Sequence, residues 1–151
     1  MILFAYDGSA GARQAIAAAS ELLSGQALVV HIWTPLPPGA APAVATPGVP
    51  GAGLAQMAEA EREIERHSSE ILEEGARQAA EAGFVVERTL IRGSGGAAWR
   101  ELLEVAESRK PDLVVVGRRG MSPLRSVMLG SVSHGIVQHS PVPVLVVPPE
   151  D

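Results

Sequence analysis

Asp112-Leu113-Val114-Val115-Val116-Gly117 is the stretch of sequence that decides the fold. Its apolar, β-branched run is typical of a strand that is buried on both faces of a parallel sheet. Gly117 therefore falls at the carboxyl end of a predicted strand. Open α/β sheets bind their ligands at these strand ends, so we expect a ligand site at this glycine.

A glycine-rich loop follows this strand. It begins with Gly117-Arg118-Arg119-Gly120, continues for nine residues and ends at Gly130-Ser131, which open a short predicted helix over 132–139. A helix start offers unpaired N–H groups and the positive end of its dipole to an anion. Glycines let a phosphate approach the backbone, and the hydroxyls of Ser131 and Ser133 are further donors. The pattern favours a phosphate site, although an ordinary turn before a helix has a similar sequence.

The charge of the chain limits its partners. A formal net charge of −5 and a pI of about 5.4 argue against electrostatic binding to nucleic acid. The two Trp, one Tyr and two Phe are too few for a base-stacking surface. Positive charge gathers beside an anion-binding geometry at Arg118 and Arg119. This pair is a candidate phosphate contact or, alternatively, a solvated surface pair.

Length and composition predict one domain over residues 1–151 with a single site. The absence of cysteine excludes a disulfide framework and a thiolate metal site, and it suits a reducing cytoplasm. The sequence has neither a basic leader followed by an apolar segment nor a run of 18 apolar residues. We therefore expect a soluble, cytoplasmic protein without membrane association.

Strand and helix signals alternate along the chain, and this alternation predicts an α/β fold in which helices cover both faces of an open parallel sheet. The expected strands are 2–6, 27–33, 84–91, 112–116 and 143–147, with 84–91 at a sheet edge. The expected helices are 10–24, 54–82, a third around 99–106 and 132–139. Ser9 is expected to cap the first helix and Gly25 to stop it.

Residues 34–53 break the alternation, because they contain six prolines and four glycines and almost no charge. A loop of this length is unusual inside a compact domain. It follows a predicted strand at the same sheet edge as Asp7 and Gly117, so it could cover the site. The alternative is a mobile insertion without a specific role.

Asp7 follows the first predicted strand. A carboxylate at this position can accept hydrogen bonds from ribose hydroxyls or from an adenine amino group. The alternative is an Asx-turn with Gly8 and Ser9. The glycine loop after the 112–116 strand favours the binding role.

Other motifs do not indicate chemistry. Residues 93–98 match G-x-G-x-x-A, but a dinucleotide fingerprint belongs in the first βα turn, so this segment is interpreted as a helix entry. No P-loop, zinc-protease motif or nucleophile elbow occurs. His31 is expected to be a hydrogen-bonded core residue, and His67 to lie on a solvated acidic helix face rather than in a metal site. We predict no catalytic residue and no protein metal site.

The chain resembles the universal stress protein family, in particular its nucleotide-binding branch. The resemblance rests on the G-x2-G-x9-G-S spacing, on the opening segment Met1–Ser9 and on the closing segment 141–148. It implies a Rossmann-like sheet with strand order 3-2-1-4-5 and ATP as the ligand, with Mg²⁺ or Mn²⁺. It implies adenosine contacts from Asp7 and Ile32 and phosphate contacts from Gly117, Gly120, Gly130, Ser131, Val132 and Ser133. The predicted nucleotide-binding set also includes Ala5, Tyr6, Arg118 and Arg119.

The resemblance also implies a homodimer formed through the last strand, residues 143–147. The predicted function is a nucleotide-responsive stress or regulatory switch that acts on an unidentified protein partner. The alternatives are a slow ATPase, a member that binds cyclic AMP, and a dimeric scaffold without nucleotide. The complete glycine signature argues against the scaffold, and the sequence does not separate ATP from cyclic AMP.

Overall fold

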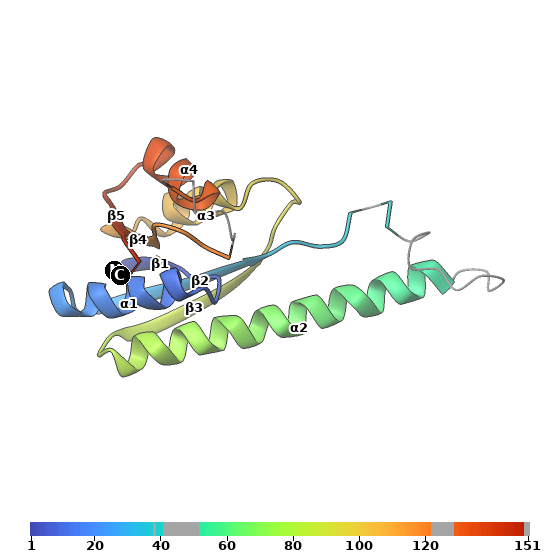
Figure 1. Cartoon of the computed structure of the whole chain (residues 1–151), viewed down its shortest axis with the longest axis horizontal. Helices are drawn as coiled ribbons and strands as arrows, with labels where there is room; N and C mark the ends of the chain where they lie inside the picture. Colours follow the sequence, from blue (N-terminus) through green and yellow to red (C-terminus); the bar gives the residue numbers. More distant parts are fainter. Residues whose placement is uncertain (38, 41–51, 122–128, 150–151) are drawn as a thin grey trace.

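The computed structural model of the chain describes residues 1–37, 39–40, 52–121 and 129–149. A parallel sheet runs through the middle of the molecule (Figure 1). Its strands are β1 Ile2–Ala5, β2 Gln26–Trp33, β3 Val85–Arg92, β4 Leu113–Gly117 and β5 Val144–Val147. They lie in the order β3-β2-β1-β4-β5, and every pairing is parallel. The predicted fold class, the strand order and the edge position of β3 are confirmed.

Helices cover both faces of the sheet (Figure 1). They are α1 Ala10–Leu22, α2 Ala52–Glu81, α3 Ala98–Arg109 and α4 Ser131–His139. α1 and α2 lie on one face and α3 and α4 on the other, and the N-terminal part of α2 extends past the sheet. None of the helices in the described part of the chain is both long and apolar enough to cross a membrane.

The alternation of side chains along the strands builds one core on each face. In β1, Phe4 packs into the core under α1 and α2, while Leu3 packs into the core under α3 and α4. In β4, Val115 packs into the core under α1 and α2, and Val116 packs into the core under α3 and α4. Because the central strands are apolar on both faces, the polar groups of the site are confined to the strand ends.

The helix boundaries differ from the sequence prediction by one to three residues, and two of the differences have a clear local cause. α1 ends at Leu22 instead of residue 24, because Leu23 is already extended and Gly25, with φ of +106°, turns the chain into β2. α4 starts one residue earlier than expected, at Ser131, with Gly130 as its N-cap. Most of the predicted loop over 34–53 falls outside the described residues, so its role as a cover stays an expectation.

Candidate functional site

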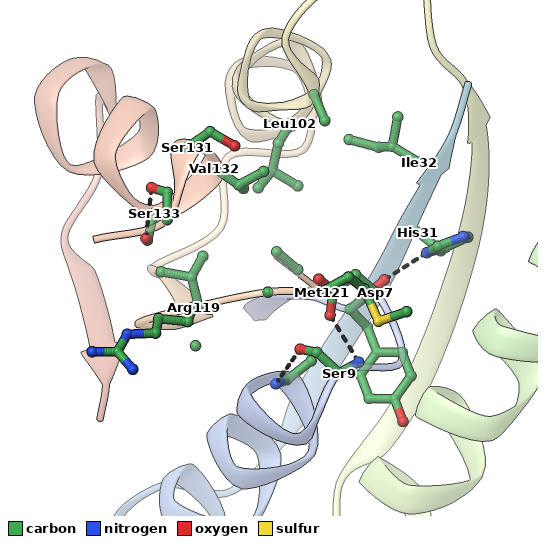
Figure 2. Close-up of a pocket in the computed structure, with 18 of the residues that line it drawn as sticks. Asp7, Ser9, His31, Ile32, Leu102, Arg119, Met121, Ser131, Val132 and Ser133 are labelled. Atoms are coloured by element: carbon green, nitrogen blue, oxygen red, sulfur yellow. Dashed lines mark hydrogen bonds between the residues drawn. The ribbon is translucent and has the colours of Figure 1, made fainter. Parts of the chain in front are cut away.

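A cavity of about 310 Å³ lies where β1, β2 and β4 end, and the first turns of α3 and α4 close it (Figure 2). Its volume falls in the range of small-molecule sites. The strand order reverses direction between β1 and β4, and ligands of open α/β sheets bind at this switch point. The cavity is therefore in the position that the sequence predicted.

All but one of the predicted site residues line this cavity, and the exception is Arg118. The predicted site residues that line it are Ala5, Tyr6, Asp7, Ile32, Gly117, Arg119, Gly120, Gly130, Ser131, Val132 and Ser133. The structure therefore brings the end of β1, the end of β2 and the glycine loop together. Seven of the nine residues between Gly120 and Gly130, residues 122–128, lie outside the described part of the chain.

Asp7 forms the Asx-turn that was the alternative considered from sequence, and it also lines the cavity, while its role in binding a ligand stays a prediction. Its Oδ1 accepts a hydrogen bond of 3.0 Å from the backbone N–H of Ser9, which is the Asx-turn. Its Oδ2 lies against Gly120, where an added Cβ would stand 2.4 Å away and would displace the carboxylate from this position. Asp7 is also the one acidic residue among the described residues of the cavity wall.

His31 is a core histidine, as predicted, and it also lines the cavity. Its Nδ1 lies 2.7 Å from the carbonyl oxygen of Tyr6, and because a carbonyl can only accept, Nδ1 carries the proton of this bond. Burial lowers the pKa of His31, and the hydrogen bond to Tyr6 only partly opposes this effect. The imidazole is thus neutral near pH 7, with Nε2 as an acceptor.

Gly117 and Gly130, at the two ends of the loop, have different surroundings. A Cβ on Gly117 would meet the backbone carbonyl of Gly11 in α1 at 2.6 Å, so this glycine allows the close packing of β4 against α1. Among the described residues, a Cβ on Gly130 would have only ordinary contacts, the nearest being Arg119 Cα at 3.5 Å. Gly117 thus has a packing reason of its own, and its role in leaving room for phosphate stays a prediction.

The start of α4 presents its backbone donors to the cavity. Its N-cap, Gly130, has no side-chain cap, and the N–H groups of Ser131, Val132 and Ser133 belong to the first turn, where helices leave such groups unpaired. The hydroxyl of Ser133 is not a free donor, because it is 3.0 Å from the carbonyl oxygens of both Arg118 and Gly130. Ser133 thus contributes its backbone N–H, while its side chain holds the loop to the helix.

Sequence reasoning missed part of the cavity wall. The missed lining residues are Ser9, Ala12, Val30, His31, Ala98, Leu102, Val116 and Met121. Ser9 was predicted only as the cap of α1, and its Oγ does accept the N–H of Ala12 at 3.1 Å. Ala98 and Leu102 stand four residues apart on α3, a spacing that marks one helix face without showing what it covers.

The segment 93–98 is a helix entry, as predicted, because α3 begins at Ala98. It is fastened by the buried carboxylate of Glu101, whose Oε1 accepts the N–H of Ser94 at 2.9 Å and its hydroxyl at 2.7 Å. The bond from the Ser94 hydroxyl, followed by the bond from its N–H, lowers the pKa of Glu101.

The described residues contain no group of three potential metal-ligating side chains. Beside His67, the carboxylates of Glu63 and Glu70 both pair with Arg66.

The model of the universal stress protein family matches residues 1–148 of this sequence. The chain belongs to the universal stress protein family. A universal stress protein of Thermus aquaticus is 34% identical over 97% of this chain and 96% of its own. The universal stress protein YxiE of Bacillus subtilis is 39% identical over 59% of this chain, and the match spans 58% of that relative.

Solved structures of universal stress proteins and related chains share the fold. The hypothetical protein MJ0577 of Methanocaldococcus jannaschii superimposes with a TM-score of 0.76 at 21% identity, covering 99% of this chain and 96% of its own. A universal stress protein in complex with cAMP has a TM-score of 0.59 at 24% identity and 99% and 96% coverage. A family protein of Arabidopsis thaliana with AMP bound has a TM-score of 0.59 at 16% identity and 99% and 91% coverage.

Proposed function

We propose that this universal stress protein binds an adenine nucleotide in the cavity between β1 and β4, with ATP as its ligand. The observation that carries the proposal is that one cavity joins the Asp7 carboxylate to the first-turn N–H groups of α4. The Asp7 carboxylate suits the hydroxyl and amino groups of a nucleoside, and the N–H groups of α4 suit phosphate. Family members of the same fold that are complexed with cAMP and with AMP support the choice of ligand class.

In this arrangement the adenosine part contacts the ends of β1 and β2, and the phosphates contact the start of α4. A Mg²⁺ or Mn²⁺ ion is expected to enter with the nucleotide. Asp7 is the one carboxylate among the described residues of the cavity wall. The phosphate oxygens of the nucleotide would therefore supply ligands of the ion that the protein does not.

The first test is to denature the purified protein and identify any nucleotide that it releases. Calorimetry then compares ATP binding to the wild type, to Gly130→Val and to Gly39→Val. We expect Gly130→Val to lose binding and to keep its circular dichroism spectrum, because position 130 has room for a Cβ at the α4 start. Gly39→Val is the matched control, since no atom of the described residues lies within 4 Å of its added Cβ. Unchanged ATP affinity in Gly130→Val would reject the assignment.

The nucleotide is proposed to act as a ligand that switches a regulatory state in the cytoplasm, for a protein partner that is still to be identified. Bound ATP stabilises the folded form by mass action, about 2.7 kcal/mol at a hundredfold excess over Kd, and can thereby change which state a partner meets. Phosphate release by the purified protein separates this proposal from a slow ATPase. Repeated turnover that disappears in Gly130→Val would show that the protein is an enzyme.

We also propose that the chain forms a homodimer through β5, as the sequence resemblance implied. β5 is the last strand of the sheet, and its residues Val144, Leu145 and Val146 remain half-exposed. An apolar edge strand is a template for pairing with another chain, and antiparallel pairing with a second copy would cover it. Light scattering at tens of micromolar tests this proposal, and a monomeric mass would reject it.

A further inference from the structure

Arg118 and Arg119 differ from most arginines of this chain in having no carboxylate partner among the described residues. The arginines that do form ion pairs are Arg13, Arg62, Arg66, Arg77, Arg88, Arg92 and Arg109. The Nε of Arg118 and the Nε of Arg119 are moreover buried and have no hydrogen-bond acceptor in the described part of the chain. Buried donors are normally paired, so an unpaired charged donor on a residue that lines a cavity points to an anionic ligand.

Arg118 and Arg119 differ in their position relative to the cavity. Arg119 lines the cavity, whereas Arg118 does not. The backbone of Arg118 is committed to the protein: its N–H donates to the carbonyl of Val147 at 2.7 Å, and its carbonyl accepts the N–H of Gly130 at 2.9 Å. Arg118 therefore joins β5 to the start of α4, and only Arg119 stands where a ligand can reach it.

Arg119 lies at the α4 end of the cavity. An added Cβ on Gly130 would be 3.5 Å from the Cα of Arg119, so the side chain starts beside the N-cap of α4. Figure 2 shows it running below Ser133 and away from Asp7 and His31. A nucleotide that places its base near Asp7 and its first phosphate on α4 would direct its further phosphates toward this guanidinium.

We infer that Arg119 binds the phosphates beyond the first and thereby makes the site select nucleoside di- and triphosphates over monophosphates and cyclic monophosphates. The inference rests on the proposed nucleotide-binding function. A first phosphate already meets the backbone N–H groups of α4, so Arg119 adds little to the binding of AMP. Additional phosphates bring charge and acceptor oxygens to a guanidinium whose planar donors match them.

The test is calorimetric titration of AMP, cyclic AMP, ADP and ATP at one salt and Mg²⁺ concentration into the wild type, Arg119→Gln and Arg118→Gln. In the wild type the affinity should rise from AMP to ADP to ATP. Arg119→Gln should weaken ATP binding about tenfold or more and change AMP binding by less than about twofold, as expected for one charged hydrogen-bonding group. Arg118→Gln is the matched control, because it removes the same charge from the neighbouring residue, and it should leave the ratio of ATP to AMP affinity unchanged.

Arg119→Lys keeps the charge and should recover part of the preference for ATP, and melting curves of each variant show whether it is folded. The inference is overturned if Arg119→Gln weakens AMP and ATP equally or weakens neither, or if Arg118→Gln is the variant that loses the preference. Those outcomes leave nucleotide binding itself intact. If the wild type binds none of the four nucleotides, the proposed function fails as well.

Discussion

The aromatic ring of Tyr6 lies so close to Gly75 of α2 that a Cβ at position 75 would stand 2.6 Å from Cδ1 of the ring. The ring cannot move aside freely, because the Tyr6 hydroxyl donates to Glu74 at 3.0 Å and the same carboxylate accepts from Arg13 at 2.6 Å. Burial, followed by this bond to Glu74, raises the pKa of Tyr6 to about 12, so the hydroxyl stays protonated and remains a donor. Tyr6, at the cavity, is thus tied to α1 and α2 through one network.

We expect Gly75→Ala to destabilise the protein, although alanine is the better helix former by about 1 kcal/mol. Overpacking in a fixed environment costs about 1–3 kcal/mol, and a 2.6 Å contact with a restrained ring belongs at the upper end. Urea unfolding should therefore show a net loss of about 1–2 kcal/mol. In a Tyr6→Ala background the ring is gone, and the same glycine substitution should stabilise. A stabilising Gly75→Ala in the wild type would contradict the packing described above.

Gly117 and Gly130 should respond differently to the same substitution. Gly117→Ala places a Cβ 2.6 Å from the α1 backbone and should cost about 2–3 kcal/mol in unfolding free energy or more. Gly130→Ala meets no such contact among the described residues, and its φ of −66° suits alanine, so it should cost about 1 kcal/mol or less as an N-cap change. Thermal melts of the two variants check this. Equal losses would show that the two glycines are required for the same reason.

The alternation of apolar strands and helices predicts the fold because each element is recognisable from its own residues. The site is predictable to the extent that it depends on strand ends, as at Asp7 and Gly117. What the sequence does not contain is which element packs against which glycine. Gly75 has the local pattern of a weak point in a helix, and only the tertiary contact with Tyr6 shows why it is there. In the same way, Arg118 and Arg119 are equivalent as a sequence pair and become different through the positions of β4, β5 and α4.

Ser94→Ala should destabilise the protein at neutral pH by about 1–3 kcal/mol, because it removes one of two donors from the buried carboxylate of Glu101. The other oxygen of this carboxylate, Oε2, already has no hydrogen-bond partner within the described residues. Urea unfolding at pH 7 measures the effect. Ser108→Ala on the exposed side of α3 is the matched control, and we expect it to change stability by about 0.5 kcal/mol or less. Equal effects of the two substitutions would argue against a special role for Glu101.

His31 should make the stability of the protein depend on pH below neutrality. Burial lowers its pKa in the folded protein, whereas in the unfolded chain it titrates near 6.5. The unfolded state therefore binds a proton before the folded state does, so the stabilising contribution is complete above about pH 6.5 and is lost as the pH falls toward the folded pKa.

Unfolding free energies at pH 7.5 and 5.5 test this for the wild type, His31→Gln and His67→Gln. The wild type should lose stability between the two values, and His31→Gln should lose less, because its side chain does not titrate. His67 is exposed on α2, so His67→Gln should retain most of the wild-type pH dependence. The prediction is rejected if His31→Gln and the wild type lose the same free energy. Because the Tyr6 carbonyl and the His31 ring stand in the cavity wall, acidification would then disturb the ligand site and the fold together.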